Sequence, residues 1–134
     1  MFEQNPENSS NTPKAAVLLA EDDTSVRRFL EIILSRAGYD VHTAEDGLAA
    51  MKIAFETKID AIVSDAMMPN LSGFDLLRTL RQNENYKTTP FIILTGFDTA
   101  IEGVDADACI TKGENLKEEL VGVLSRLLDA AVSR

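Results

Sequence analysis

The sequence predicts an α/β protein in which helices cover a parallel sheet. Short continuous apolar runs, typical of strands buried on both faces, alternate with segments whose apolar residues recur at helical spacing. Each strand–helix–strand unit of this kind requires a right-handed crossover, which leaves its two strands parallel. The length of 134 residues suits one domain with its own hydrophobic core.

The first strand and the first helix of this sheet are expected in residues 15–36. Residues 15–20 form a continuous apolar run that ends in acids, as a doubly buried strand does. Thr24 or Ser25 can cap the helix that follows, and Gly38 stands where a glycine commonly ends a helix. The apolar residues of this helix fall on one stripe, which consists of Val26, Phe29, Leu30, Ile33 and Leu34.

The middle of the chain contains three further strands and two helices. Residues 39–43 and 59–64 are predicted strands, and between them Asp46 precedes a helix with several alanines and an isoleucine. A helix is expected over residues 73–81, where apolar residues again recur at helical spacing, and a fourth strand over residues 91–94. The alternation of strands and helices therefore continues through the middle of the chain.

The last part of the chain adds a fifth strand and a terminal helix. Residues 108–110 form a short, weak strand. The terminal helix has the strongest amphipathic pattern of the chain, built from Leu116, Leu120, Val123, Leu124, Leu127, Leu128 and Ala131.

The charge balance excludes several classes of protein. The chain has 22 acidic and 13 basic residues, a net charge of −9 and a pI near 4.5. A general nucleic-acid binder or a protein that docks on anionic lipid needs a basic face, which this composition does not favour. No apolar run is long enough to cross a bilayer, and the N-terminus does not have the pattern of a signal peptide. We therefore expect a cytoplasmic protein.

The N-terminal segment and the cysteine content limit the organisation further. Residues 1–13 are rich in Asn, Ser and Pro, so they are expected to be a disordered tail before a single domain over residues 14–134. Cys109 is the one cysteine in the sequence, which excludes an internal disulfide and a cysteine-rich metal cluster.

Polar side chains stand where four of the expected strands end. They are Glu21, Asp22 and Asp23 after the first strand, Asp65 after the third, Thr95 at the end of the fourth and Lys112 after the fifth. The carboxyl ends of parallel strands meet at one edge of a sheet, and ligands of such sheets bind there. Converging carboxylates repel one another unless a cation lies among them, and oxygen ligands of this kind suit Mg²⁺.

Taken one at a time, these residues have ordinary structural interpretations. Runs of acids at strand ends are usually solvated, a lone Asp is commonly a cap or turn residue, and a lysine is commonly a surface charge. Their joint occurrence at the ends of four different strands favours a shared site.

These residues and their neighbours resemble the receiver domain of two-component response regulators. The resemblance covers about residues 14–134 and is specific because its motifs occur in the same order and at suitable intervals. The matching segments are Val17-Leu18-Leu19-Ala20-Glu21-Asp22-Asp23, Val63-Ser64-Asp65-Ala66-Met67-Met68-Pro69, Ile93-Leu94-Thr95-Gly96 and Ile110-Thr111-Lys112.

The resemblance implies a fold and a reaction. The fold is a flavodoxin-like (βα)5 doubly wound parallel sheet with strand order 2-1-3-4-5. Asp65 is then the phosphoacceptor, which receives a phosphoryl group from the phosphohistidine of a histidine kinase or a phosphotransfer protein. Thr95 would hydrogen-bond the phosphoryl group, and Lys112 would pair with it. Such a domain is a phosphoacceptor that assists its own phosphorylation and dephosphorylation rather than an enzyme acting on other molecules.

The resemblance also implies a Mg²⁺ cofactor and its ligands. Glu21 and Asp22 would hold the ion, Asp22 most directly, together with Asp65 and the backbone carbonyl of Met67. Asp23 is less clearly a ligand. A carboxylate is a weak nucleophile, so the rate must come from alignment and from charge neutralisation by Mg²⁺ and a lysine.

Three departures from the family pattern bear on signal output. Cys109 replaces the usual aromatic residue three positions before Lys112; we expect it to be a small core residue, and it cannot act as an aromatic rotamer switch. The segment 97–107 is short and has four acids and little apolar surface, which predicts a shortened or irregular fourth helix. Gly113 replaces the usual proline, which favours a trans peptide bond after Lys112. The signal is therefore expected to leave by another route, such as ordering of the loop at 96–107.

Three functions remain open from the sequence. The leading one is a stand-alone response regulator that signals by protein–protein interaction or phosphorelay, because the chain ends directly after its terminal helix. The second is a receiver-like interaction module that works without phosphorylation. The third, least favoured, is an α/β-fold phosphatase, which needs a second aspartate where Thr24 stands; a nucleotide-dependent enzyme would need a Gly-rich loop there.

Overall fold

A five-stranded parallel sheet forms the centre of the protein. The computed structural model describes residues 13–96 and 105–132. The strands stand in the order β2-β1-β3-β4-β5, and every neighbouring pair is parallel. Their bounds are β1 (Ala16–Ala20), β2 (Asp40–Ala44), β3 (Ala61–Asp65), β4 (Phe91–Thr95) and β5 (Ala108–Thr111). The predicted fold class and strand order are therefore confirmed.

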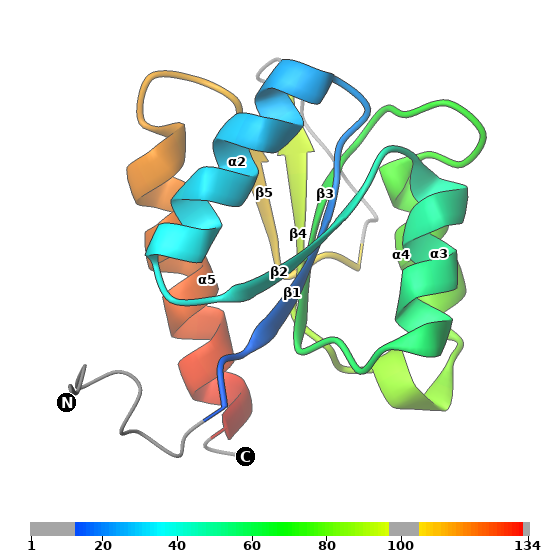
Figure 1. Cartoon of the computed structure of the whole chain (residues 1–134). Coiled ribbons are helices and arrows are strands. Elements are labelled where there is room, and N and C mark those ends of the chain that lie inside the picture. The colour runs from blue at the N-terminus through cyan, green and yellow to red at the C-terminus, as the bar shows by residue number, and fades with distance from the viewer. Residues whose placement is uncertain (1–12, 97–104, 133–134) are drawn as a thin grey trace, which may run out of the picture.

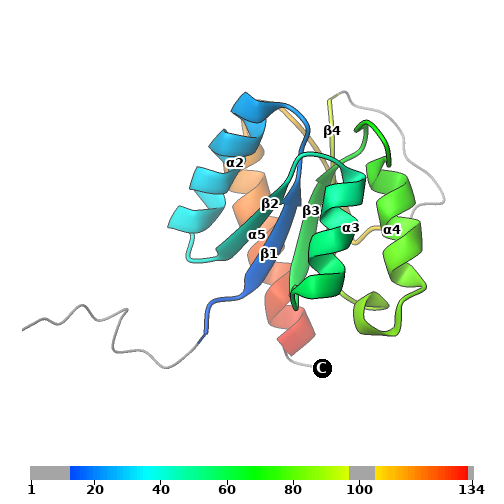
Figure 2. The ribbon, with the colours of Figure 1, turned by 45° about the vertical axis from the view of Figure 1, so that its right-hand side comes forward.

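Helices cover both faces of this sheet, as Figures 1 and 2 show. One face is covered by α2 (Thr24–Arg36) and α5 (Leu116–Val132). The other is covered by α3 (Gly47–Glu56) and α4 (Gly73–Arg81), and the short 3₁₀ helix η1 (Glu84–Tyr86) follows α4. The strands separate the two helix layers, so neighbouring side chains along a strand enter different cores.

The central strands divide their side chains between two hydrophobic cores. In β1, Val17 and Leu19 pack with α2 and α5, whereas Leu18 and Ala20 pack with α3 and α4. All five residues of β1 are buried. Burial on both faces is the physical reason why this strand is a continuous apolar run rather than an alternating one.

The helix ends follow the sequence closely, with one correction. The helix α3 begins directly after Asp46, as predicted, and Asp46 caps it, since its carboxylate accepts a hydrogen bond from the Ala49 amide. The cap of α2 is Asp23, not Thr24 or Ser25 as predicted. The carboxylate of Asp23 accepts from the amide of Val26 at 2.9 Å, and Asp23 is not part of the cluster formed by Glu21, Asp22 and Asp65.

Strand β3 begins two residues later than predicted, because Asp60 has another role. The Asp60 carboxylate accepts a hydrogen bond from the Ala16 amide at 2.7 Å, and the Asp60 amide donates to the Ala16 carbonyl at 2.8 Å. A side chain thus takes the place of a backbone acceptor where β1 begins.

The prediction that Cys109 is a core residue was wrong. Strand β5 pairs only with β4, so it forms an edge of the sheet. Ile110 points into the core beneath α5 and is buried, whereas Cys109 is on the opposite face and is exposed. In this chain an exposed cysteine therefore occupies the position where an aromatic residue is usual.

Of the remaining expectations, the structure tests the peptide bond after Lys112 but not the N-terminal tail or the helix predicted over residues 97–107. The peptide bond after Lys112 is trans, because residues 13–96 and 105–132 contain no cis peptide bond. The predicted tail falls almost wholly on residues 1–12, and the predicted fourth helix and the loop proposed for signal output fall mainly on residues 97–104. These parts lie outside the described residues. Within the described residues, no helix is long and apolar enough to span a membrane.

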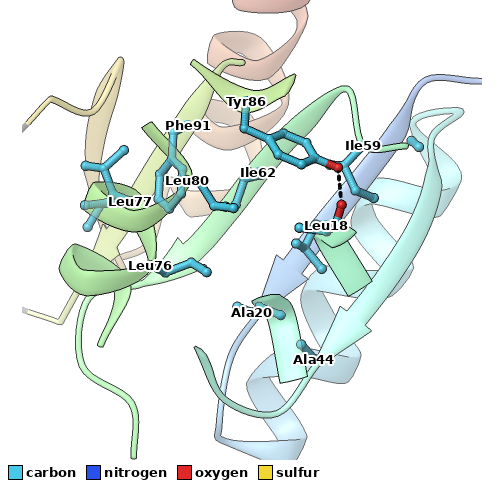
Figure 3. Close-up of a cluster of buried hydrophobic side chains, with 14 of the residues drawn as sticks. Leu18, Ala20, Ala44, Ile59, Ile62, Leu76, Leu77, Leu80, Tyr86 and Phe91 are labelled. Carbon is cyan, nitrogen blue, oxygen red and sulfur yellow. Dashed lines mark hydrogen bonds between the residues drawn. The ribbon is translucent and has the colours of Figure 1, made fainter. Parts of the chain in front are cut away.

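Tyr86 connects η1 to the end of α3 across the core (Figure 3). Its ring is buried among the apolar residues beneath α3 and α4. The hydroxyl donates to the backbone carbonyl of Ala54 at 2.6 Å and lies 3.0 Å from that of Thr57. It therefore satisfies carbonyl groups that the end of a helix leaves without partners.

We predict that Tyr86→Phe lowers the free energy of unfolding by about 1 kcal/mol, the usual net value of such a hydrogen bond. The loss arises because the Ala54 carbonyl stays buried without its donor. Urea denaturation checks this, with an unchanged m-value as the control for an intact fold. A variant as stable as the wild type would show that the hydroxyl contributes nothing.

Candidate functional site

The register of the sheet brings the predicted site residues to one edge. Asp65 ends β3 opposite Leu94 of β4, and Thr95 ends β4 opposite Thr111 of β5. Glu21 directly follows β1, and Lys112 directly follows β5. Four strand ends thus present their polar groups on the same side of the molecule, as expected for parallel strands.

Three carboxylates come together at this edge. One oxygen each from Glu21, Asp22 and Asp65 lies within 4.8 Å of the other two. Glu21 is 1% exposed and the Asp65 side chain 13%, whereas Asp22 faces solvent. A cluster of hard oxygen ligands with an open side fits Mg²⁺, which retains waters and shares ligands with phosphate.

Lys112 provides the positive charge that faces this cluster. Its Nζ lies 2.6 Å from Oε1 of Glu21 and 3.1 Å from Oδ2 of Asp65. Its backbone amide also donates to the carbonyl of Thr95 at 2.7 Å, so its main chain is tied to β4. The lysine therefore connects β1, β3 and β4 from the end of β5.

Burial and charge shift the pKa values of this ion pair. Burial raises the pKa of the Glu21 carboxyl and the nearby Asp65 charge adds to it, while Lys112 and the Asp23 amide oppose the rise. Burial alone would lower the pKa of the Lys112 ammonium, but its hydrogen bond to Glu21 and the charge of Asp65 outweigh that effect, so its pKa is raised. Lys112 is thus charged at neutral pH.

Sequence reasoning did not identify Arg27 as a support of the acid cluster. Its Nη1 donates to the backbone carbonyl of Glu21 at 2.8 Å and lies 3.4 Å from that of Asp22. The arginine stands on α2 and reaches back to the loop that precedes the helix. The sequence feature that could have indicated this role is a basic residue at the fourth position of a helix that follows a run of acids.

Gly73 allows α4 to begin against the backbone of the predicted phosphoacceptor. A Cβ at this position would lie 2.2 Å from the carbonyl oxygen of Asp65 and 3.0 Å from Oγ of Ser64. The Gly73 amide donates to the Ala66 carbonyl at 2.9 Å, which closes the loop between β3 and α4. Only glycine permits this approach.

The same loop is attached to the start of α3. Asn70 has a left-handed backbone with φ of 70°, and its side-chain amide donates to Asp46 at 2.8 Å. These contacts fix the far side of the loop, while the Met67 side chain near its start is exposed. The loop is therefore held in place at Asn70, while its side chain at Met67, two residues after Asp65, faces solvent.

The fold and this acidic site are those of receiver domains, and comparison with known proteins agrees. Residues 17–123 match the family model described as the response regulator receiver domain. The chain therefore belongs to this family, whose members are the phosphoacceptors of two-component signalling and bind Mg²⁺ in an acidic pocket. Receiver domains accept their phosphoryl group from histidine kinases.

Curated relatives are identical to this chain at about a third of the aligned positions. It is 35% identical over 116 residues to the response regulator ArlR of Staphylococcus saprophyticus, which covers 83% of this chain and 51% of ArlR. It is 34% identical over 113 residues to protein PilG of Pseudomonas aeruginosa, which covers 81% of this chain and 83% of PilG. The chain thus spans about half the length of ArlR but most of PilG.

Solved structures give the same result. The chemotaxis response regulator CheY4 of Vibrio cholerae aligns with a TM-score of 0.79 and 33% identity, over 86% of this chain and 99% of CheY4. The receiver domain of the sensor histidine kinase PA1611 from Pseudomonas aeruginosa aligns with a TM-score of 0.78 and 28% identity, over 87% of this chain and 99% of that domain. The PA1611 structure has a magnesium ion coordinated in its active-site cleft.

We predict that Gly73→Ala destabilises the protein by about 1–3 kcal/mol, the range for overpacking a tight contact. The added methyl must displace the Asp65 carbonyl or the start of α4. Thermal or urea unfolding measures the loss.

Gly122→Ala in the middle of α5 is the matched control. A Cβ there meets only Nη1 of Arg126, at 3.6 Å. We expect this control to stabilise the protein by about 0.5–1 kcal/mol, the gain for alanine over glycine inside a helix. Equal effects at the two positions would contradict the packing argument.

Proposed function

We propose that the protein is a response regulator whose phosphoacceptor is Asp65. The observation that carries this proposal is the joint contact of Lys112 with Glu21 and Asp65, beside three carboxylate oxygens that lie within 4.8 Å of one another. A lysine and an acidic cluster around one carboxylate match the needs of phosphoryl transfer, in which positioning and charge neutralisation supply the rate.

In the proposed reaction, an oxygen of the Asp65 carboxylate attacks the phosphorus of a phosphohistidine. The new P–O bond forms as the P–N bond breaks, and the departing imidazole keeps the electron pair and takes up a proton. Asp65 suits this role because it ends a central strand and its backbone is held by the close approach of Gly73. The carboxylate thus meets its donor in a fixed orientation.

The proposed ligands of Mg²⁺ are Glu21, Asp22, Asp65 and the backbone carbonyl of Met67. When bound, the ion neutralises negative charge on the phosphoryl oxygens and on the three carboxylates. Asp22 is the most accessible of the three acids, whereas Glu21 is buried and held by Lys112. Arg27 orients the backbone of both residues.

Lys112 and Thr95 complete the proposed site. The Lys112 ammonium would move from the Asp65 carboxylate to the phosphoryl oxygens once Asp65 is modified, keeping its contact with Glu21. Thr95 would donate its hydroxyl to the same group from the end of β4. With Mg²⁺ the same groups would assist hydrolysis of the aspartyl phosphate, which makes the protein a self-assisting phosphoacceptor.

We further propose that the donor is a histidine kinase or a histidine phosphotransfer protein, and that output is a protein–protein contact or a further phosphoryl transfer. The chain covers most of PilG and CheY4 but only about half of ArlR, so this output is proposed for the receiver domain itself. A single cysteine suits the reducing conditions of the cytoplasm. The exposed Cys109 at the usual aromatic position is the observation that favours the second candidate, a receiver-like module that works without phosphorylation.

We predict that Asp65→Asn abolishes phosphorylation by acetyl phosphate with Mg²⁺, because an amide is not a competent nucleophile here. Intact-mass spectrometry measures the added phosphoryl group. Asp40→Asn is the matched control, since Asp40 begins β2 at the opposite end of the sheet and is exposed. Unchanged incorporation in Asp65→Asn would exclude this residue as the acceptor, and no incorporation in the wild type would favour the interaction module.

We also predict that Mg²⁺ stabilises the folded protein through Asp22. At a Mg²⁺ concentration of about 100 times the Kd, binding to the native state alone adds about 2.7 kcal/mol. Thermal unfolding with and without the ion measures this, and Asp22→Asn should lose most of the effect. Asp23→Ser should keep it, because Asp23 serves as a helix cap and serine replaces that function. An equal loss in both variants would contradict the proposed ligand set.

A further inference from the structure

Arg81 makes an unusually large set of contacts at the end of α4. Its side chain is only 13% exposed. The guanidinium donates to the backbone carbonyls of Tyr86 at 3.1 Å and Thr89 at 2.7 Å. It also forms ion pairs with Asp105 at 3.3 Å and with Asp107 at 3.1 Å. One side chain therefore joins the segment after α4 to the segment before β5.

Asp107 transmits this contact to the sheet. Its Oδ2 accepts both from Arg81 and from the backbone amide of Phe91, the latter at 2.8 Å. Its own amide donates to the Phe91 carbonyl at 2.9 Å. Asp107 thus extends the pairing of β4 and β5 by one residue before Ala108. Asp60 does the same for β1 and β3, also at the amino ends of the strands.

Strand β5 has few other contacts that hold it in place. It has four residues, pairs with β4 alone, and exposes Cys109 and Thr111. Its far end leads directly into Lys112, whose amide bonds to the Thr95 carbonyl. Because a strand moves along its neighbour as a unit, the position of its first residue determines where the lysine stands.

We propose that Arg81 is a positioning residue for Lys112. By holding Asp105 and Asp107 it keeps the start of β5 in register with β4, so that the lysine at the other end reaches Glu21 and Asp65. The consequence for phosphoryl transfer rests on the function proposed above, whereas the effect on β5 does not.

An ordinary surface ion pair is the simpler alternative. Exposed pairs contribute little to stability, because water screens both charges, and they do not act at a distance. Arg78 provides this case on the same helix, one turn earlier: it pairs with Asp75, and its side chain is 68% exposed. Arg81 differs because it is largely buried and donates to backbone carbonyls as well as to carboxylates.

Amide hydrogen exchange of the unmodified protein tests the effect on β5. We expect Arg81→Gln to speed exchange at residues 108–112 by about tenfold, as loss of an anchor opens a local segment, and to leave β1 unchanged. Arg78→Gln makes the same change of charge on the same helix and should leave both regions unchanged. Exchange at 108–112 equal in the two variants would overturn the proposal.

Asp107→Asn tests the same link without removing the arginine. The asparagine oxygen can still accept from Phe91, but the charge that holds Arg81 is lost. We expect faster exchange at residues 108–112 here too, by a smaller factor than in Arg81→Gln. No change would show that Arg81 does not act through Asp107 and would overturn the proposed route.

A double-variant cycle tests the link to Lys112. With acetyl phosphate and Mg²⁺, Arg81→Gln should slow phosphorylation several-fold, and it should slow it no further when Lys112→Ala is already present. Rate losses that simply multiply would mean that Arg81 acts independently of Lys112 and would overturn the proposal. A wild-type chain that takes up no phosphoryl group would contradict the proposed function, and the exchange experiment would still decide whether Arg81 positions β5.

Discussion

The contact of one lysine with two buried carboxylates is the constraint on which the site depends. Charges taken out of water are costly unless they are paired and hydrogen-bonded, and removal of one partner leaves the other exposed to that cost. Lys112 meets this requirement for both Glu21 and Asp65, and in doing so it joins the ends of three strands. Every strand that supplies a partner must therefore end at the same level. The parallel sheet achieves this for β1, β3 and β4 because buried apolar runs, rather than the charges of the site, set their register.

The supports of this site are built from close backbone contacts. Gly73 brings the start of α4 against Asp65, and Arg27 holds the carbonyls of the acid pair. Both act on main-chain atoms, so they fix the backbone from which the acidic side chains extend. The three acids still outnumber the single lysine, and this imbalance is what makes the pocket suitable for a divalent cation. The backbone contacts of Gly73 and Arg27 and the excess of negative side chains thus give a site whose geometry is set before a ligand binds.

This chain departs from the pattern of its family at one position of β5. Cys109 stands where an aromatic ring is usual, and it is exposed on an edge strand rather than packed in the core. A cysteine has no ring to exchange between an inward and an outward position. Strand β5 is held instead by polar contacts at both ends, through Asp107 at its start and Lys112 after its last residue.

The sequence by itself determined the fold class, the order of the elements and most of the site. Continuous apolar runs mark doubly buried strands whatever surrounds them, and the polar residues that follow those runs must lie at one edge of a parallel sheet. Asp65 and Lys112 could be found in this way. The family resemblance already favoured Asp22 over Asp23 as a ligand. Tertiary structure supplied the physical reason, since the two acids have the same chemistry and only the geometry of α2 assigns the cap to Asp23. It also decided the exposure of Cys109 and the link between Arg81 and Asp107, which stand 26 residues apart. Such contacts depend on how helices pack and strands register, and a local pattern of residue types contains no information about them.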